Sequence, residues 1–597
     1  MTRPVPFVLA TLLVATLAAC RSDSPASEPK SDPTPDRRTT DAWFVDRAQE
    51  SGLSFQHVNG MTGAYYESEI FAPGVALFDY DNDDDLDAYI VQGHRLVVGA
   101  TGVPAPEGSV PSGDRLFRND LVVNPDGTRA PRFTDVTADS GIRVTTYGMG
   151  IAAGDVDNDG WTDLYLTRLG PNVLLHNNGD GTFSDTSGPS GTADPSWSVS
   201  ASFLDFDRDG WLDLYVGNYM EYSLEGDRPC TGITGRPDYC PPAAYPAVAD
   251  RLYRNRGNGS FTDVTSRAGM RGEARPALGV STADFNGDGW VDIYVANDGT
   301  ENNLWLNQGD GTFKDIAVVA GAALTAEGDA EASMGLDAGD FDNDGDEDLV
   351  IANLTSEGTT LYGNDGRGAF EDWGVRSGLR PNSLPYTGFG NAWIDVDNDG
   401  WLDVFTVNGA VRIIDRLVAA GETYPLRQPR QLFRNLGTGR FEDVTSLAGE
   451  ALTRATVARG AAFGDVDNDG DVDVLVGNSN GVAELLINLV GQRHHFAGIR
   501  VVGRPTNATR PGRDMLGARV VARSADGRTL SRRARSDGSY ASANDPRVVL
   551  GLGASSGDIQ VQVTWPDGNK EEWANVPADR WTTLEEGSGQ RVDASAR

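Results

Sequence analysis

Seven Asp-rich loops are the part of this 597-residue sequence whose residue types and spacing could do chemistry. Each loop follows the pattern D-x-D/N-x-D-G-x-x-D and leads into a run of apolar and β-branched residues. Hard cations such as Ca²⁺ take roughly six to eight oxygen ligands, which positions 1, 3 and 5 can direct at one point. Glycine at position 6 permits the sharp turn because it adopts positive φ at little cost. The pattern predicts calcium sites in loops that begin at Asp79, Asp155, Asp205, Asp284, Asp340, Asp395 and Asp465.

The ninth residue separates these loops from EF-hands. An EF-hand closes its site with Glu at position 12 and lies between helices, whereas position 12 here is aliphatic or Thr. We expect the ninth residue, always Asp, to close the site, and the backbone carbonyl of position 7 to contribute. The predicted ligands are Asp79, Asp81, Asp83, Asp85 and Asp87; Asp155, Asp157, Asp159, Trp161 and Asp163; Asp205, Asp207, Asp209, Trp211 and Asp213; Asp284, Asn286, Asp288, Trp290 and Asp292; Asp340, Asp342, Asp344, Asp346 and Asp348; Asp395, Asp397, Asp399, Trp401 and Asp403; Asp465, Asp467, Asp469, Asp471 and Asp473.

Two loops depart from the pattern. Asp84 takes the glycine position of the first loop, and Asn286 supplies a neutral oxygen in the fourth. The alternative interpretation is that the loops are acidic surface turns without metal. Four converging carboxylates without a cation would repel one another, so the calcium interpretation is favoured. Calcium suits such flexible, carboxylate-rich loops better than magnesium.

The net charge of −37, from 50 Lys and Arg against 87 Asp and Glu, follows largely from the same loops. Seven bound Ca²⁺ would reduce it to about −23. An acidic chain of this kind argues against a nucleic-acid partner, which would require a basic face.

The N-terminal residues predict export. Arg3 precedes an apolar stretch that ends in Leu17-Ala18-Ala19-Cys20, which resembles a bacterial lipoprotein signal with its lipobox. Residues 1–19 would then be the signal peptide, Cys20 the lipidated residue, and residues 20–41 a Ser/Pro/Asp-rich tether. An ordinary secretory signal is the alternative. Arg21, where Asp would signal inner-membrane retention, favours the outer membrane and the cell surface.

Two further cysteines, Cys230 and Cys240, are expected to form a disulfide in an oxidising compartment. They flank a short insertion, residues 228–242. A redox or zinc role is the weaker alternative.

The repeat predicts blades of a β-propeller. Most loops are followed by an apolar pair, Asn, a Gly-rich turn and an F-x-D-V-T-like strand, which makes about four short strands for each unit. The last unit lacks its final strand, whereas residues 44–46 have no loop before them. We expect this N-terminal strand to complete the last blade, giving a closed seven-bladed propeller over residues 42–490. Residues 494–590 form a separate small β domain.

These residues resemble the FG-GAP/VCBS repeats of integrin α-subunits and bacterial surface proteins. The C-terminal landmarks Gly538-Ser539-Tyr540 and Trp565-Pro566-Asp567-Gly568 resemble an ASPIC/UnbV domain, as in the bacterial relatives of cartilage acidic protein. The resemblance implies an all-β fold in which calcium is structural and lies opposite the usual ligand face.

Outside the loops the candidate ligand-binding residues are Glu69, Arg275 and Arg459, which could meet at the mouth of the propeller channel. They could equally be solvated rim charges. Aromatic residues placed similarly could stack on sugars, or could pack between blades; they are Tyr65, Tyr66, Tyr147, Trp197 and Phe389. Six arginines could bind an acidic glycan or lipid, or could face the acidic propeller of the same chain; they are Arg519, Arg523, Arg528, Arg532, Arg533 and Arg535.

We therefore expect a monomeric cell-surface module that binds a glycan or a surface protein and touches the membrane only through its lipid anchor. The sequence assigns no catalytic residue. The alternative is a secreted polysaccharide lyase or hydrolase that uses the channel, which would need a base and a charge neutraliser converging there.

Overall fold

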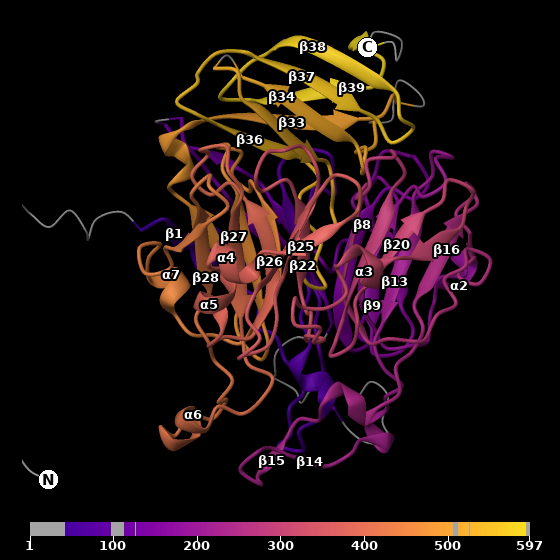
Figure 1. Cartoon of the computed structure of the whole chain (residues 1–597), viewed down its shortest axis with the longest axis vertical. Coiled ribbons are helices and arrows are strands. Elements are labelled where there is room, and N and C mark those ends of the chain that lie inside the picture. The colour runs from indigo at the N-terminus through magenta and orange to yellow at the C-terminus, as the bar shows by residue number, and fades with distance from the viewer. Residues whose placement is uncertain (1–41, 97–112, 126, 506–511, 525, 593–597) are drawn as a thin grey trace, which may run out of the picture. The chain divides into compact units, whose positions relative to one another are not determined.

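The computed structural model describes residues 42–96, 113–125, 127–505, 512–524 and 526–592. The strands form seven four-stranded antiparallel sheets and a C-terminal β region (Figure 1). The sheets, in chain order, are β2 (Val75–Phe78), β3 (Asp87–Ile90), β4 (Arg115–Asn119) and β7 (Phe133–Asp135); β8 (Gly148–Gly154), β9 (Asp163–Arg168), β10 (Val173–Asn177) and β11 (Phe183–Asp185); β12 (Ser198–Leu204), β13 (Asp213–Asn218), β16 (Arg251–Asn255) and β17 (Phe261–Asp263); β18 (Ala277–Ala283), β19 (Asp292–Asn297), β20 (Asn303–Asn307) and β21 (Phe313–Asp315); β22 (Leu336–Gly339), β23 (Asp348–Ile351), β24 (Thr360–Asn364) and β25 (Phe370–Asp372); β26 (Gly388–Ile394), β27 (Asp403–Asn408), β28 (Gln431–Asn435) and β29 (Phe441–Asp443); β30 (Ala458–Gly464), β31 (Asp473–Asn478), β32 (Glu484–Asn488) and β1 (Phe44–Asp46).

The N-terminal strand β1 forms the outer strand of the seventh sheet. Phe44 pairs with Asn488 and Asp46 with Leu486 in an antiparallel register. The first strand of each sheet packs against the first strand of the next, and β30 packs against both β26 and β2. The chain thus brings its first and seventh sheets side by side, in the arrangement of a β-propeller.

Small residues let the innermost strands approach one another closely. β8 reads Gly-Met-Gly-Ile-Ala-Ala-Gly, and all seven residues are buried. A Cβ added to Gly150 would lie 2.3 Å from the carbonyl oxygen of Val199 on the neighbouring strand β12. Only glycine fits there, so the backbones of adjacent sheets meet without side chains between them.

The C-terminal region consists of two sheets around a core of its own. Val520, Val561 and Trp565 are among the buried residues between them. The three-stranded sheet has the order β36 (Val548–Gly553), β33 (His495–Val502) and β39 (Trp581–Glu585). The five-stranded sheet has the order β35 (Thr529–Arg533), β34 (Arg519–Arg523), β37 (Ile559–Thr564), β38 (Lys570–Val576) and β40 (Gln590–Arg591). The expected turn at Asp526-Gly527 joins β34 to β35, which pair in antiparallel fashion.

Short elements occupy the connections. They are α1 (Ala48–Ser51), η1 (Glu67–Ile70), β5 (Val122–Val123), β6 (Arg129–Ala130), α2 (Ser187–Ser190), η2 (Leu224–Gly226), β14 (Cys230–Thr231), β15 (Pro237–Asp238), η3 (Pro242–Ala244), α3 (Ala317–Ala320), α4 (Gly374–Ser377), α5 (Leu379–Ser383), α6 (Asp415–Ala419), α7 (Glu450–Thr453) and η4 (Gly491–Arg493). Within the described ranges, every helix is too short or too polar to cross a membrane. The predicted signal peptide, Cys20 and the tether lie outside the described residues.

Candidate metal centres and channel

Each Asp-rich loop connects the first and second strands of its sheet, as the sequence predicts. In the second loop the carboxylate of Asp155 accepts hydrogen bonds from the amides of Asp159 at 3.2 Å and Gly160 at 2.8 Å. Gly160 has φ 88°, the conformation for which the sixth position requires glycine. The loop therefore curls around its own first aspartate.

The aspartate at position 9 of every loop accepts hydrogen bonds from two backbone amides. One oxygen accepts from the amide of the second loop residue and the other from the amide of an Asn at the end of the third strand, at 2.7 to 3.3 Å. This carboxylate thus ties the loop to its sheet, a role that the sequence analysis missed. The aspartates are Asp87, Asp163, Asp213, Asp292, Asp348, Asp403 and Asp473.

The same asparagines join neighbouring sheets. Each donates from Nδ2 to the carbonyl of the second loop residue in the preceding sheet, at 2.7 to 3.0 Å. Asn119 of the first sheet binds Val466 of the seventh, so this set of bonds also joins the two ends of the array. The other donors are Asn177, Asn255, Asn307, Asn364, Asn435 and Asn488. The recurring Asn was visible in the sequence, but its partner was not.

The aspartate at position 3 of most loops has a buried oxygen that matches a metal ligand. In five loops this Oδ1 is buried without a hydrogen-bond partner in the described residues; the residues are Asp81, Asp157, Asp207, Asp397 and Asp467. Oxygens of positions 1, 3 and 9 lie within 4.8 Å of one another in the first three loops. Burying an ionised oxygen without a partner is costly. A hard cation would satisfy this donor set, and the loop residues fit calcium.

The raised pKa values of the loop carboxylates agree with a site built for a cation. Burial, reinforced by neighbouring loop carboxylates, raises the pKa of Asp155 to about 7 and that of Asp395 to about 8. Burial likewise raises the pKa of Asp213 to about 9. These carboxylates resist ionisation unless a positive charge lies among them.

His176 is a further group at the second loop that sequence reasoning did not place there. Its Nδ1 lies 3.1 Å from Asp163 Oδ1 and 3.9 Å from Asp157 Oδ2. The hydrogen bond to Asp163 raises the pKa of His176 to about 9. A protonated imidazole here is a counter-charge for the loop, so His176 would compete with a cation for the same carboxylates.

The channel between the seven sheets is filled from the C-terminal region. The segment 535–545, between β35 and β36, enters the channel, where Tyr540 is fully buried with its ring centre 4.8 Å from that of Phe389. Its backbone binds innermost strands: Ile151 donates to the carbonyl of Ala541 at 3.1 Å, and Leu336 to that of Ser539 at 3.0 Å. This segment is a plug, which the sequence analysis did not anticipate.

The structure does not bring the predicted ligand-binding residues Glu69, Arg275 and Arg459 together as one exposed site at the channel mouth. Arg459 lies within β30 and is fully buried; it donates to the carbonyls of Ile70, Gly409 and Ala410. Burial lowers its pKa to about 10.

Glu69 lies next to Ile70, whose carbonyl accepts from Arg459, whereas Arg275 lies in a different part of the fold. Glu69 is buried, and its Oε2 accepts from Tyr239 Oη at 3.0 Å. Arg275 pairs with Glu301 at 3.1 Å and Asp315 at 3.5 Å, in the fourth sheet and its connections. All three charges are therefore engaged within the protein.

The aromatic residues pack rather than stack on a ligand. Tyr147, Trp197 and Phe389 belong to one buried cluster with Tyr540 and Phe71. Tyr65 and Tyr66 are partly buried against the same cluster. These five aromatic residues therefore pack inside the protein, as the second of the two interpretations expects.

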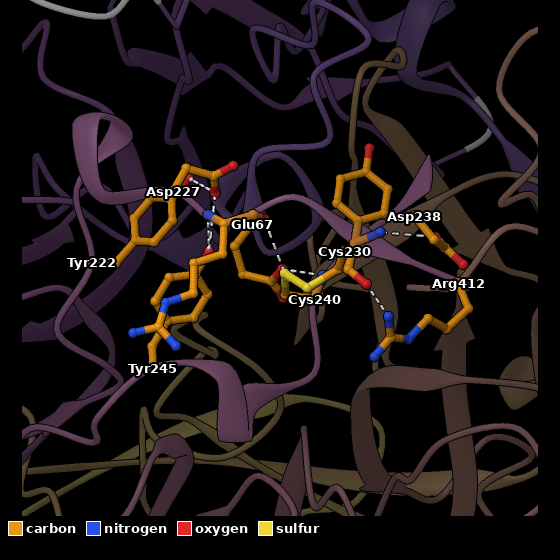
Figure 2. The surroundings of a disulfide bond; sticks show 10 residues. Glu67, Tyr222, Asp227, Cys230, Asp238, Cys240, Tyr245 and Arg412 are labelled. Atoms are coloured by element: carbon orange, nitrogen blue, oxygen red, sulfur yellow. Dashed lines mark hydrogen bonds between the residues drawn. A yellow bond between two sulfur atoms is a disulfide. The ribbon is translucent and has the colours of Figure 1, made fainter. Parts of the chain in front are cut away.

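The other end of the channel is covered by the insertion that carries the disulfide, which the structure confirms between Cys230 and Cys240. Figure 2 shows its surroundings: the amide of Cys240 binds Glu67 Oε2 at 3.0 Å, and Arg412 reaches the carbonyl of Tyr239. Burial raises the pKa of Glu67 to about 8. β14, β15 and α6 lie at the end opposite the C-terminal strands (Figure 1).

Four of the six predicted C-terminal arginines, Arg528, Arg532, Arg533 and Arg535, face the propeller of the same chain, whereas Arg519 bonds Ser531 of its own domain and Arg523 is exposed. Arg535 forms a buried ion pair with Asp337 at 2.5 Å, and Arg533 lies 3.4 Å from Glu347. Arg528 donates to the carbonyl of Asp399 at 2.8 Å, in the sixth loop. Arg500 pairs with Asp84 of the first loop at 2.7 Å. The intramolecular alternative is therefore correct for these side chains, which bind the loop face of the sheets.

Comparison with known proteins identifies both parts of the chain. FG-GAP-like repeats match residues 155–216, 235–295, 284–351, 340–406 and 415–476, and an ASPIC and UnbV domain matches residues 508–591. Cartilage acidic protein 1 of Homo sapiens is 28% identical over 318 residues, which is 53% of this chain and 44% of the relative. The Mus musculus protein is 28% identical over 315 residues, 53% of this chain and 45% of the relative. The chain thus matches less than half the length of these relatives.

Solved structures show looser likenesses. A lectin of Agrocybe aegerita that recognises non-reducing terminal N-acetylglucosamine has a TM-score of 0.36 at 15% identity, over 69% of this chain and 87% of the lectin. The BP39L lectin of Burkholderia pseudomallei has a TM-score of 0.40 at 11% identity, over 70% of this chain and 96% of the lectin. Nothing about a ligand follows from values this low. The repeats and the C-terminal domain together place this chain in the family of FG-GAP-repeat proteins with an ASPIC/UnbV domain.

Proposed function

We propose that this protein is an exported, lipid-anchored, calcium-stiffened propeller that acts at the cell surface as a binding module for a glycan or a partner protein. The observation that carries the calcium part is the buried third-position oxygen that has no hydrogen-bond partner among the described residues in five loops. A bound cation would satisfy these oxygens and neutralise the carboxylates around them.

Calcium in this account is structural. When bound, it supplies positive charge that holds the loop carboxylates together. The chain's own contribution is the ninth aspartate, which connects each loop to its sheet, and the asparagines, which connect each sheet to the one before it. Stiffening the loops would therefore stiffen the contacts between sheets.

Channel catalysis, the alternative function, receives no support from the geometry. A lyase would need a base and a cation converging on an open cavity. Tyr540 fills the channel instead, and Arg459 is enclosed by backbone carbonyls. We therefore favour a binding role at the outer surfaces.

Export and anchoring rest on the lipobox-like residues before Cys20. Replacing Cys20 by Ser should move the protein from the membrane fraction to the soluble fraction after export. Retention in the membrane fraction would contradict the anchor.

The test of the binding role uses residues 42–597, which form one compact unit. This soluble chain is passed over acidic and neutral polysaccharides in calcium and in chelator, and cell-surface cross-linking is run in parallel. Calcium-dependent capture of one glycan or one protein supports the proposal. Capture of neither under any condition would contradict it.

A further inference from the structure

A large cleft lies between the loop face of the propeller and the C-terminal domain. Its volume is about 780 Å³, within the roughly 300–1,000 Å³ range of ligand pockets. One wall comprises parts of the third, fourth and fifth Asp-rich loops, including Asp205, Asp284 and Asp344. The facing wall includes Arg519 and Lys570 of the C-terminal domain. The first residues of the plug, 535–537, line its inner end.

The charge of the cleft depends on its calcium sites. Its lining contains eight carboxylates and five cationic side chains, an excess of three negative charges. One Ca²⁺ in each of the three loops would turn this into an excess of three positive charges. A cleft that becomes cationic only when calcium is bound is suited to an anionic ligand in the presence of calcium.

Not all five cations are equally available. Arg533 and Arg535 are engaged by Glu347 and Asp337. Arg519 donates from Nε to Ser531 Oγ at 2.8 Å and is only partly buried on the wall. Lys570 is exposed on β38. Arg519 and Lys570 are therefore the cations of the C-terminal wall that an entering ligand would meet.

We propose that this cleft binds a carboxylated oligosaccharide in a calcium-dependent manner. The inference rests on the proposed function and adds to it a site and a ligand class. The positive charge of the calcium-loaded cleft would attract the carboxylates of uronic acids. Arg519 offers the planar donor pair that suits a carboxylate, and Lys570 adds a point charge on the same wall. The opposing acidic loops would exclude the ligand when calcium is absent.

The experiment is isothermal titration calorimetry on residues 42–597. The probes are a tetrameric oligogalacturonate and the same tetramer with its carboxylates methyl-esterified, each titrated in calcium and in chelator, with a blank titration into calcium buffer. Calcium content is measured on the same samples by native mass spectrometry. We expect heat of binding from the acid in calcium, and none from the ester or in chelator.

Charge reversal locates the site. Lys570→Glu and Arg519→Glu should each weaken binding of the acid by about tenfold or more, because each removes a charge-assisted contact and adds repulsion. Lys314→Glu is the matched control: Lys314 is an exposed strand residue of the fourth sheet outside the cleft lining. It should leave the affinity unchanged, and all three variants should melt within a few degrees of the parent.

The outcomes separate the inference from the proposed function. A chain that binds calcium but not the acid tetramer overturns the inference alone. Binding that both charge reversals leave intact overturns the assignment to this cleft. Equal affinity for an acidic peptide of the same charge overturns the sugar class. A chain that binds no calcium contradicts the proposed function itself.

Discussion

Replacing Asp403 by Ala tests the role of the ninth loop residue. Asp403 is 1% exposed, and its carboxylate accepts from the amide of Val396 at 3.0 Å and from that of Asn435 at 2.7 Å. The substitution leaves two buried amides without an acceptor, at about 1–3 kcal/mol each. We therefore expect the free energy of unfolding to fall by about 2–6 kcal/mol, a large part of the stability of an ordinary domain.

The assay is urea unfolding in calcium and in chelator. Because the two hydrogen bonds from the amides do not involve the metal, most of the fall in the free energy of unfolding should persist in chelator. Asp443→Ala is the control: Asp443 is exposed and accepts one amide, from Thr445 at 3.0 Å, so its loss should stay below about 1 kcal/mol. Equal stabilities of Asp403→Ala and the parent in chelator would refute the reasoning.

Three more perturbations address other parts of the account. In chelator, thermal melts should show stability falling as pH rises from 5.5 to 8. The reason is that the pKa of Asp155 is about 7 in the folded state, above its unfolded value, so the proton that favours the folded state is lost over this range. Calcium should remove most of this pH dependence, and a rise of stability with pH in chelator would contradict it. Tyr540→Ala should cost about 3–5 kcal/mol in urea unfolding, whereas Tyr540→Phe should be nearly neutral because the hydroxyl is buried with no hydrogen-bond partner in the described residues. Asn119→Ala should cost about 1–3 kcal/mol by the loss of its bond to Val466, and exposed Asn178→Ala, the control, should melt like the parent.

Local patterns were sufficient to predict the repeating unit. Loop residues such as Asp155 and Gly160 act within nine positions of one another, so their spacing alone reveals the turn and the strands on either side. The strand β1 was predictable because the seventh unit ends at Asn488 without the final strand that the other units have. The disulfide followed from a short insertion with two cysteines.

The contacts that fill the channel were not predictable from spacing. Tyr540 meets Phe389 across 151 positions, and Asn119 meets Val466 across 347. Arg459 comes shortly before the seventh loop and looks like a rim charge in the sequence. In the fold it donates to the carbonyl of Gly409, next to the preceding sheet, and to that of Ile70 in η1. Such pairings depend on how the sheets surround the channel, which no local pattern encodes.

The central claim is that the loops hold calcium and that the ions stiffen the sheets. The most direct measurement is native mass spectrometry of residues 42–597 with a melting curve on the same sample, before and after chelation. The account predicts up to seven bound Ca²⁺ and a marked fall in melting temperature when they are removed. No bound calcium, together with an unchanged melt in excess chelator, would contradict it.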